Sequence, residues 1–230
     1  AQPTSNPASN HVRQTDEIVQ LTRIENHLTP HHLTVTGGLH ETVPTGRRTV
    51  LLIGHVEPGF WQHFKTCAEW QDGKPDPIDR WSGRVLSGIA SDLGAEALFP
   101  FGGPPWHPFY RWAIASGHAF VSPVRLLVGA GSGLFASFRG ALAFSEQLPL
   151  PPSQPRPCDS CAEQPCLDAC PVGALTAAGY DIQRCHAFLD TGDGADCMNN
   201  GCAVRRACPL SLSYARLAEQ SAYHMRQFHK

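Results

Sequence analysis

The chain has 230 residues and a mass of 25.0 kDa, which suffices for one large domain or two small ones. Charged residues make up 17% and hydrophobic residues 42%, a balance that excludes a disordered or fibrous protein. The net charge of −2 argues against binding to nucleic acid or a membrane surface, and the apolar runs are too short to span a bilayer. We therefore expect a soluble globular protein.

The first predicted elements precede residue 57. Residues 1–12 are rich in Ser, Asn and Pro and are predicted to be a flexible lead-in. Apolar residues recur at helical spacing over 16–28, which predicts a helix. The continuous apolar run within 48–56 predicts a buried strand.

Helices and strands alternate in the part that follows. A helix is expected after Glu57-Pro58-Gly59, with Phe60, Phe64, Cys67 and Trp70 on one face, and a second helix over 77–93 before Gly94. A short strand is predicted at 97–99, and two strands over 124–144. This mixture of helices and strands predicts an α+β protein whose first domain is an α/β layer.

Proline marks the expected domain boundary. Five of the nine residues 149–157 are proline, which suits a stiff, extended linker and neither a helix nor a central strand. We therefore predict an α/β domain over 13–148 and a cysteine-rich domain over 158–230 that ends in a helix.

Cysteine is the most informative residue type. Nine occur, and all but Cys67 lie after residue 157. The odd total and a polar N-terminus without an apolar signal segment favour a reducing compartment, so we expect the protein in the cytoplasm. The chain begins at Ala1 and not at Met, which leaves processing or truncation open.

The spacing of these cysteines favours iron–sulfur clusters. The first half reads Cys158-x2-Cys161-x4-Cys166-x3-Cys170-Pro171, and the second reads Cys185, then Cys197-x4-Cys202-x5-Cys208-Pro209. Thiolates are soft ligands, and a cubane needs four of them, so eight cysteines suit two [4Fe–4S] clusters. In two-cluster ferredoxins the cysteine before proline binds the other cluster. This crossover assigns one cluster to Cys158, Cys161, Cys166 and Cys208, and the other to Cys170, Cys185, Cys197 and Cys202.

Other uses of the eight thiols stay open. Two four-cysteine zinc sites would need the same number, although zinc sites usually pair two Cys-x2-Cys knuckles. A set of disulfides is a further alternative, as is one cluster beside a degenerate second site.

Two parts of the cysteine segment resemble known families. Residues 158–175, Cys-Asp-Ser-Cys-Ala-Glu-Gln-Pro-Cys-Leu-Asp-Ala-Cys-Pro-Val-Gly-Ala-Leu, resemble bacterial dicluster ferredoxin modules. The pattern Arg184-Cys185, Gly201-Cys202 and Cys208-Pro209 is similar to the iron–sulfur domain of epoxyqueuosine reductase and reductive dehalogenases. The chain departs from those enzymes because it lacks a second Cys-x2-Cys-x3-Cys-Pro motif. Segment 98–144 contains Phe101-Gly102-Gly103-Pro104-Pro105 and Gly133-Leu134-Phe135-x3-Arg139-Gly140. It is similar to bacterial ferredoxin-type proteins that are distantly related to cobalamin-processing proteins.

This resemblance implies a nitroreductase-like domain before a dicluster ferredoxin-like domain. It also implies a redox protein that relays single electrons to a corrinoid, or to a flavin in its place, or to a small-molecule substrate, as in a cobalamin-dependent reductase. The alternative is an electron carrier whose N-terminal domain only docks a redox partner protein. No nucleic acid or membrane is expected as a partner, and no catalytic or cofactor-binding residue can be named.

Candidate residues of the first domain are assigned structural roles. The segment 129–133 lacks dinucleotide-binding spacing and is predicted to be a hairpin turn, with a phosphate cradle as the alternative. The loop 101–107 is predicted to be a rigid connector, with a cofactor border as the alternative. Structural or surface roles are also expected for His31, His32, His40, His55, His63, Asp79, Arg80, Trp81, Arg125 and Cys67.

Overall fold

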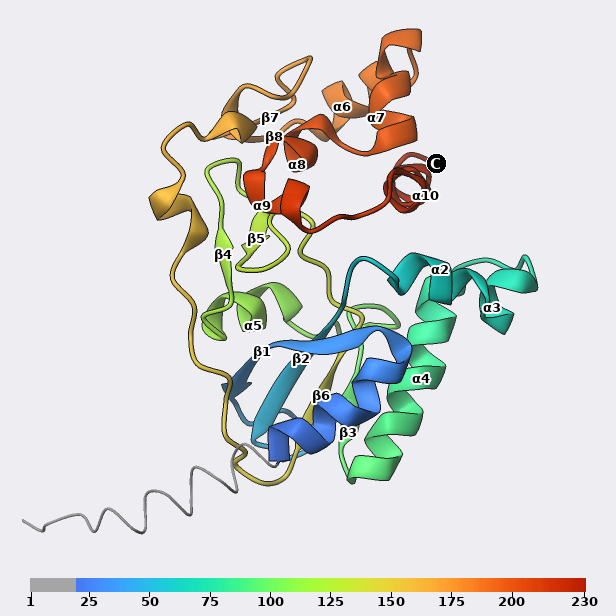
Figure 1. Cartoon of the computed structure of the whole chain (residues 1–230), viewed down its shortest axis with the longest axis vertical. Coiled ribbons are helices and arrows are strands. Elements are labelled where there is room, and N and C mark those ends of the chain that lie inside the picture. Colours follow the sequence, from blue (N-terminus) through green and yellow to red (C-terminus); the bar gives the residue numbers. More distant parts are fainter. Residues whose placement is uncertain (1–19) are drawn as a thin grey trace, which may run out of the picture. The chain divides into compact units, whose positions relative to one another are not determined.

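The structure is a computed structural model that describes residues 20–230 (Figure 1), so the predicted lead-in 1–12 lies outside the described residues. By its internal contacts the chain divides into two compact units. Unit 1 contains the described residues up to 55 together with 67–107 and 138–152, and unit 2 contains 56–66, 108–137 and 153–230. Both units mix helices and strands, which confirms the α+β class.

Unit 1 is built on one antiparallel sheet of four strands in the order β1-β2-β6-β3. The strands are β1 (Leu33–His40), β2 (Thr49–His55), β3 (Glu96–Leu98) and β6 (Gly140–Phe144). Every residue of β2 and β6 is buried, because the central strands are covered on both faces. The buried strand predicted within 48–56 is therefore confirmed as β2.

Helices of unit 1 cover this sheet. Residues 20–28 are helical, whereas 16–19 of the predicted helix lie outside the described residues. This helix is tied to β1, since the Glu25 carboxylate accepts the backbone N–H of Val35 at 2.9 Å. The short helix η1 (Thr29–His31) follows it. Helix α4 (Pro77–Leu93) has the predicted bounds, contacts β3 and β6, and ends at Gly94 in the left-handed conformation that favours glycine.

The prediction of a single helix that carries Phe60, Phe64, Cys67 and Trp70 is wrong. The segment forms two short helices, α2 (Phe60–Lys65) and α3 (Ala68–Gln71). Cys67 lies between them with an extended backbone (φ −79°, ψ 152°), which ends one hydrogen-bonded helix and starts another. Apolar spacing continues across this break and hides it from a periodicity argument.

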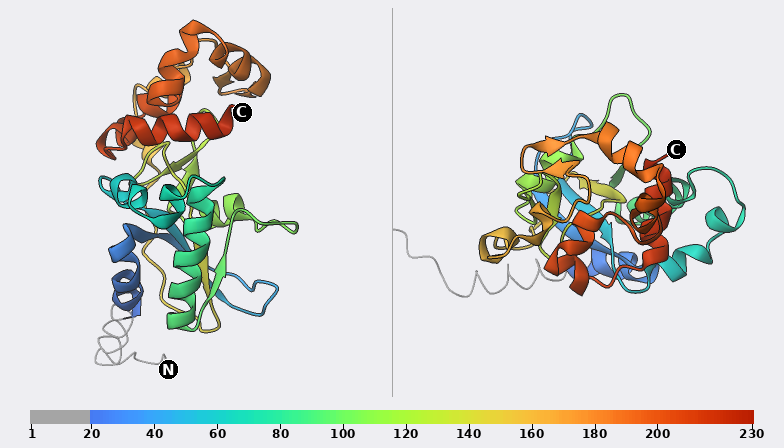
Figure 2. Two further views of the ribbon diagram at one scale, coloured as in Figure 1. Left: turned by 90° about the vertical axis from the view of Figure 1, so that its right-hand side faces the viewer. Right: turned by 90° about the horizontal axis from the view of Figure 1, so that it is seen from above.

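Unit 2 contains short elements around the cysteines. Before the linker it has α2, α5 (Phe109–Ala115), β4 (Ala119–Val121) and β5 (Leu127–Gly129). After the linker come η2 (Pro157–Ser160), η3 (Pro165–Leu167), β7 (Leu175–Thr176), β8 (Gly179–Tyr180), α6 (Ile182–Leu189), η4 (Gly192–Gly194), α7 (Ala195–Asn200), α8 (Ala203–Ala207), α9 (Pro209–Ser213) and α10 (Ala218–Phe228). The C-terminal helix α10 packs on α7 (Figure 2). It also contacts α2, where Lys65 and Glu219 form a 2.8 Å ion pair.

The two strands expected over 124–144 are β5 and β6, and they belong to different units. The predicted linker at 149–157 divides the sequence into a part before the cysteine segment and the cysteine segment itself. Unit 2, however, contains residues 56–66 and 108–137 from before this linker. The predicted domain limits stay a prediction.

Among residues 20–230, no helix combines the length and the apolar character that crossing a membrane requires.

Candidate metal centre

Short helices and turns place the eight clustered cysteines. Prolines stand at the first positions of η2, η3 and α9, where the missing N–H costs nothing. Each of these prolines is next in sequence to a cysteine, namely Cys158, Cys166 and Cys208. The elements carry Cys158 (η2), Cys161 (after η2), Cys166 (η3), Cys170 (between η3 and β7), Cys185 (α6), Cys197 (α7), Cys202 (before α8) and Cys208 (between α8 and α9).

Four of these thiols line one cavity in unit 2. The cavity has a volume of about 390 Å³, and its lining includes Cys158, Cys161, Cys166 and Cys208, here called the first thiol set. Burial raises the pKa of the Cys166 thiol, and the neighbouring thiols of Cys158 and Cys208 raise it further. The tertiary fold therefore brings Cys208 to the three cysteines that begin the segment.

The other four thiols form a second neighbourhood in unit 2. Burial raises the pKa of Cys185, and the thiols of Cys202, Cys170 and Cys197 raise it further, whereas a hydrogen bond from Tyr180 lowers it. Burial likewise raises the pKa of Cys197, with Cys202 as a neighbouring thiol. We call Cys170, Cys185, Cys197 and Cys202 the second thiol set.

The remaining cysteine belongs to unit 1. Cys67 lies near the guanidinium of Arg84, whose pKa it raises after the larger effect of Glu69. No two cysteines within residues 20–230 are joined by a disulfide. In the same part of the chain, no three or more His, Cys, Asp and Glu side chains form a group that could hold a metal ion. The first thiol set is accordingly defined by the cavity that it lines. The second set is defined by the effects of its thiols on the pKa of Cys185.

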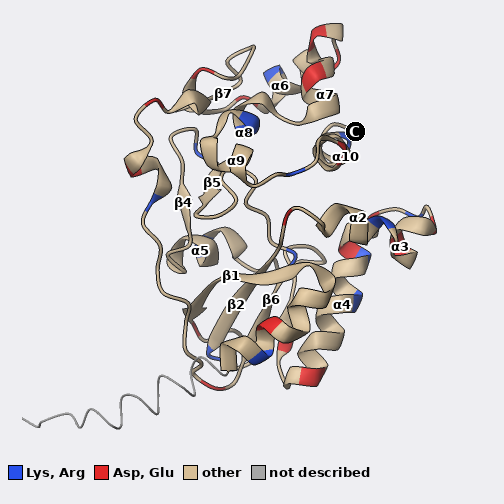
Figure 3. Cartoon of the chain, in the orientation of Figure 1, with Lys and Arg blue, Asp and Glu red and all other residues tan. Residues whose placement is uncertain are grey.

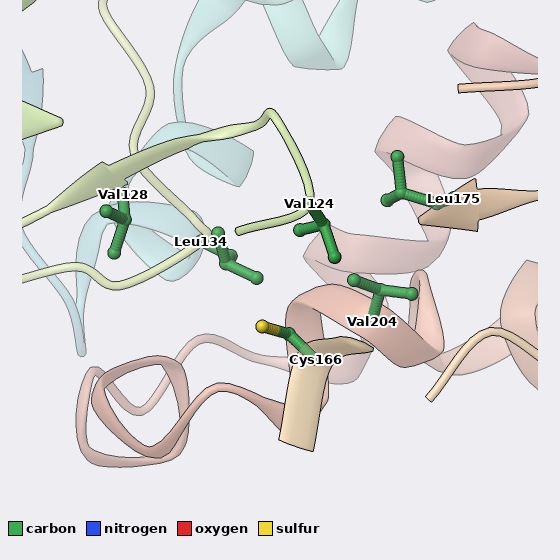
Figure 4. Packing of buried hydrophobic residues seen from close by; sticks show 6 residues of the cluster. All are labelled: Val124, Val128, Leu134, Cys166, Leu175 and Val204. Carbon is green, nitrogen blue, oxygen red and sulfur yellow. The ribbon is translucent and has the colours of Figure 1, made fainter. Parts of the chain in front are cut away.

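A hairpin from before the linker closes the apolar side of the first thiol set. The strands β4 and β5 pair antiparallel, and the loop between them places Val124 against Cys166 in a buried cluster. Figure 4 shows this cluster, which contains Val124, Val128, Leu134, Cys166, Leu175 and Val204. The ribbon of β4, β5 and α9 carries no charged residue (Figure 3). Cys166 is therefore buried against an apolar wall, whereas Cys158, Cys161 and Cys208 are partly exposed.

One polar group of this hairpin faces the cavity without a partner. Ser122 lines the cavity and is 4% exposed. Its hydroxyl oxygen has no hydrogen-bond partner among the described residues. Leaving a buried hydroxyl unsatisfied costs about 1–3 kcal/mol, so this atom fits a ligand in the cavity that accepts a hydrogen bond. Four thiols and one orphaned hydroxyl around one cavity suit an iron–sulfur cluster.

The second thiol set receives hydrogen bonds from its surroundings. The backbone N–H of Ala174 donates to Sγ of Cys170 at 3.2 Å, and that of Ala203 donates to Cys197. The Tyr180 hydroxyl donates to Sγ of Cys185 at 3.3 Å. The positively charged Arg205 guanidinium lies near Cys202. These donors and the positive charge stabilise negative charge on the sulfurs.

The other candidate residues make structural contacts. Arg80 forms an ion pair with Asp72 at 2.8 Å, and Arg125 donates to the carbonyl of Ala177 at 3.1 Å. Asp79 lies 4.0 Å from Arg139, and burial raises the pKa of its carboxyl. His40 donates through Nε2 to the carbonyl of Leu148 at 2.8 Å.

The remaining candidates are placed by the structure as follows. Trp81 and His55 are buried, His31 and His32 lie in or beside η1, and His63 lies in α2. The segment 129–133 forms a turn that is closed by two backbone hydrogen bonds of 2.9 and 3.0 Å between Gly129 and Gly133. The loop 101–107 contains no helix or strand and carries the exposed Trp106.

Sequence reasoning missed Ser122 and Tyr180. Ser122 comes before the linker and meets the cysteines only through tertiary contacts, so no local signal could have found it. Tyr180 lies five residues before Cys185, and the hairpin β7–β8 that carries it is too short for a periodicity argument.

No protein family, curated protein or solved structure matches this chain. The resemblance of its cysteine segment to dicluster ferredoxin modules therefore stays a prediction.

Proposed function

We propose that this chain is an iron–sulfur redox protein that binds two [4Fe–4S] clusters and relays single electrons. The observation that supports the proposal is the division of eight thiols into two sets of four. Cys208 adjoins the first three cysteines, whereas Cys170 adjoins the later ones. This exchange between halves is the crossover that two-cluster ferredoxins use.

The spacing of the cysteines favours a cluster over zinc. Structural zinc sites usually pair two Cys-x2-Cys knuckles, and the segment has only Cys158-x2-Cys161. In a cubane each thiolate binds a different iron, so the ligands surround a volume.

The residues of the chain have distinct roles in this proposal. The eight cysteines hold iron as thiolates, and bound clusters supply one-electron chemistry. The apolar side chains around Cys166 shield this thiol from water. Backbone N–H groups such as that of Ala174 donate to the sulfurs of the second set. Donors and burial of this kind tune the affinity for an electron.

The finer fold assignment belongs to the same proposal. We infer a dicluster ferredoxin-like arrangement for the cysteine segment 158–230 and a nitroreductase-like layer within 13–148. The antiparallel sheet of unit 1 with α4 packed on it supports a layered first domain. The proposed location is the cytoplasm, where thiols stay reduced.

Metal analysis tests the proposal directly. The protein is purified under nitrogen, and iron, acid-labile sulfide and zinc are measured per chain. We expect about eight irons and eight sulfides, and a visible absorption that dithionite bleaches reversibly. Colourless protein that contains only zinc would contradict the proposal.

A cobalamin titration identifies the electron acceptor. If the electron acceptor is a corrinoid, a flavin in its place or a substrate at the N-terminal part, the protein is a reductase. If the acceptor is a partner protein, the protein is an electron carrier. A base-off shift in the spectrum of added cobalamin supports a corrinoid-dependent reductase. An unchanged spectrum together with tight binding of a redox partner supports the carrier.

A further inference from the structure

Tyr180 touches the second thiol set although it lies outside the cysteine pattern. Its hydroxyl is 3.3 Å from Sγ of Cys185 and donates a hydrogen bond to it. The hairpin β7–β8 and the start of α6 set this geometry. Tyr180 pairs with Leu175, and Asp181 caps α6 by accepting the backbone N–H of Arg184 at 2.9 Å.

The ring of Tyr180 is held from the far end of the chain. Phe228, at the end of α10, stacks on the Tyr180 ring with centroids 6.1 Å apart. The same Phe228 ring stacks on His186, the neighbour of Cys185, at 4.6 Å. Because one ring stacks on both Tyr180 and His186, the Tyr180 hydroxyl is oriented by packing as well as by its hydrogen bond.

Tyr180 differs from the other donors of this set because a substitution can remove it. Ala174 and Ala203 donate through backbone N–H groups, which every residue except proline supplies. Phenylalanine at position 180 would keep the ring and its stack and remove only the O–H. The chain thus offers a clean test of one hydrogen bond to one sulfur.

A donor at a ligand sulfur favours the state with more negative charge. A cluster gains one negative charge when it accepts an electron from a reductant such as dithionite, and part of that charge lies on the cysteine sulfurs. An O–H dipole directed at one of those sulfurs stabilises the reduced state more than the oxidised state.

We propose that Tyr180, acting through Cys185, raises the reduction potential of the cluster held by the second thiol set. This inference rests on the proposed function. It makes Tyr180 a positioning residue and leaves the ligand set unchanged.

The experiment compares Tyr180→Phe with Tyr110→Phe in anaerobic protein that contains its full iron complement. Tyr110 is an exposed tyrosine of α5 and serves as the matched control. A redox titration followed by electron paramagnetic resonance measures the midpoint potentials of both clusters. We expect Tyr180→Phe to lower one midpoint by a three- to tenfold change in the one-electron equilibrium, where tenfold equals about 59 mV. Tyr110→Phe should move neither.

Three further variants test the assignment of the effect. In a Cys208→Ala background, which removes a ligand of the first set, Tyr180→Phe should still lower the midpoint potential. In a Cys202→Ala background, Tyr180→Phe should no longer lower it. Phe228→Leu keeps the hydroxyl but removes the ring stack, and we expect a smaller fall of the same midpoint.

The outcomes separate this inference from the proposed function. Wild-type protein without iron and sulfide would refute the proposed function itself. Wild-type protein with two clusters whose midpoints do not respond to Tyr180→Phe or Phe228→Leu would overturn only the role of Tyr180. A fall that persists in the Cys202→Ala background would also overturn it.

Discussion

The backbone N–H of Leu134 donates to the hydroxyl of Ser211 at 2.9 Å, and this hydrogen bond is buried in unit 2. It joins the loop after β5 to α9, the helix that Cys208 precedes. Arg205 adds a second link because its guanidinium donates to the carbonyl of Leu134. A loop from before the linker therefore holds the segment that delivers Cys208 to the first thiol set.

Close packing at this loop predicts a strong effect of Gly133→Ala. Gly133 has a φ of +56°, and a Cβ there would lie 2.5 Å from the backbone nitrogen of Ser211. We expect the substitution to lower the free energy of unfolding by about 2–4 kcal/mol, because it combines backbone strain with a clash against backbone. Anaerobic urea unfolding followed by circular dichroism measures this change.

The same loop supplies the control for that substitution. A Cβ at Gly131 would meet nothing within 4 Å, so Gly131→Ala should change the free energy by less than about 0.5 kcal/mol. Equal urea midpoints for the two variants would show that the contact with α9 does not stabilise the unit.

Removing Cys208 tests the division of the thiols. Cys208→Ala should lower the iron content from about eight to about four atoms per chain, because three remaining thiols hold the first cluster poorly. Cys67→Ala is the control, since Cys67 belongs to unit 1, and it should leave the iron content unchanged. Iron and sulfide are measured on anaerobic protein. An unchanged iron content in Cys208→Ala would remove this residue from the ligand set.

Ser122 provides a separate probe of the cavity. Its buried hydroxyl has no partner among the described residues, and we expect it to donate to a sulfur of the cluster proposed for the first thiol set. Ser122→Ala should lower the midpoint potential of that cluster by up to about 60 mV, a tenfold change for one electron. A redox titration measures the shift.

Ser160 is the matched control for Ser122. It lines the same cavity, but it is exposed and its hydroxyl donates to the carbonyl of Pro157 at 3.2 Å. Ser160→Ala should therefore leave both midpoints unchanged. If Ser122→Ala behaves like Ser160→Ala, the Ser122 hydroxyl does not reach the cluster.

The shifted pKa of Glu57 predicts that the free energy of unfolding depends on pH. Burial raises the pKa of its carboxyl above the usual 4.5, and this effect exceeds the opposing effects of the hydrogen bond from Gln220 and the charge of Arg216. Just above pH 4.5 the folded protein keeps a proton that the unfolded chain has lost. The contribution of Glu57 to the free energy of unfolding must therefore fall as the pH rises through this window.

Glu57→Gln should abolish that fall, as urea unfolding between pH 4.5 and 7 would measure. Glu219 is the contrasting carboxylate, because its hydrogen bond with Lys65 lowers its pKa. Its contribution is present above pH 4.5 and is lost as the pH decreases. Glu219→Gln should therefore lower the free energy of unfolding above pH 4.5 and approach the wild-type value at lower pH. The same pH slope in Glu57→Gln and wild type would exclude a role for Glu57.

The sequence alone determined elements whose signals are local. The apolar run of β2 and the proline and glycine at the two ends of α4 predicted both elements, because such signals act within one turn or one strand. The break at Cys67 was not predictable, since apolar spacing continues across it. The cysteine spacing also predicted a division of the thiols into two sets, because a cysteine that precedes proline serves the other half of a dicluster segment.

Only the tertiary structure decided what surrounds those thiols. Ser122 and Leu134 reach the cysteine segment from before the linker, and Phe228 reaches Tyr180 from the C-terminal end. These contacts join residues that lie far apart in the chain. Bringing such residues together lowers the conformational entropy of the chain, and the simultaneous burial of many groups must offset this cost. No short stretch of sequence encodes such contacts, so the sequence predicts candidate ligands, whereas only the tertiary structure shows what surrounds them.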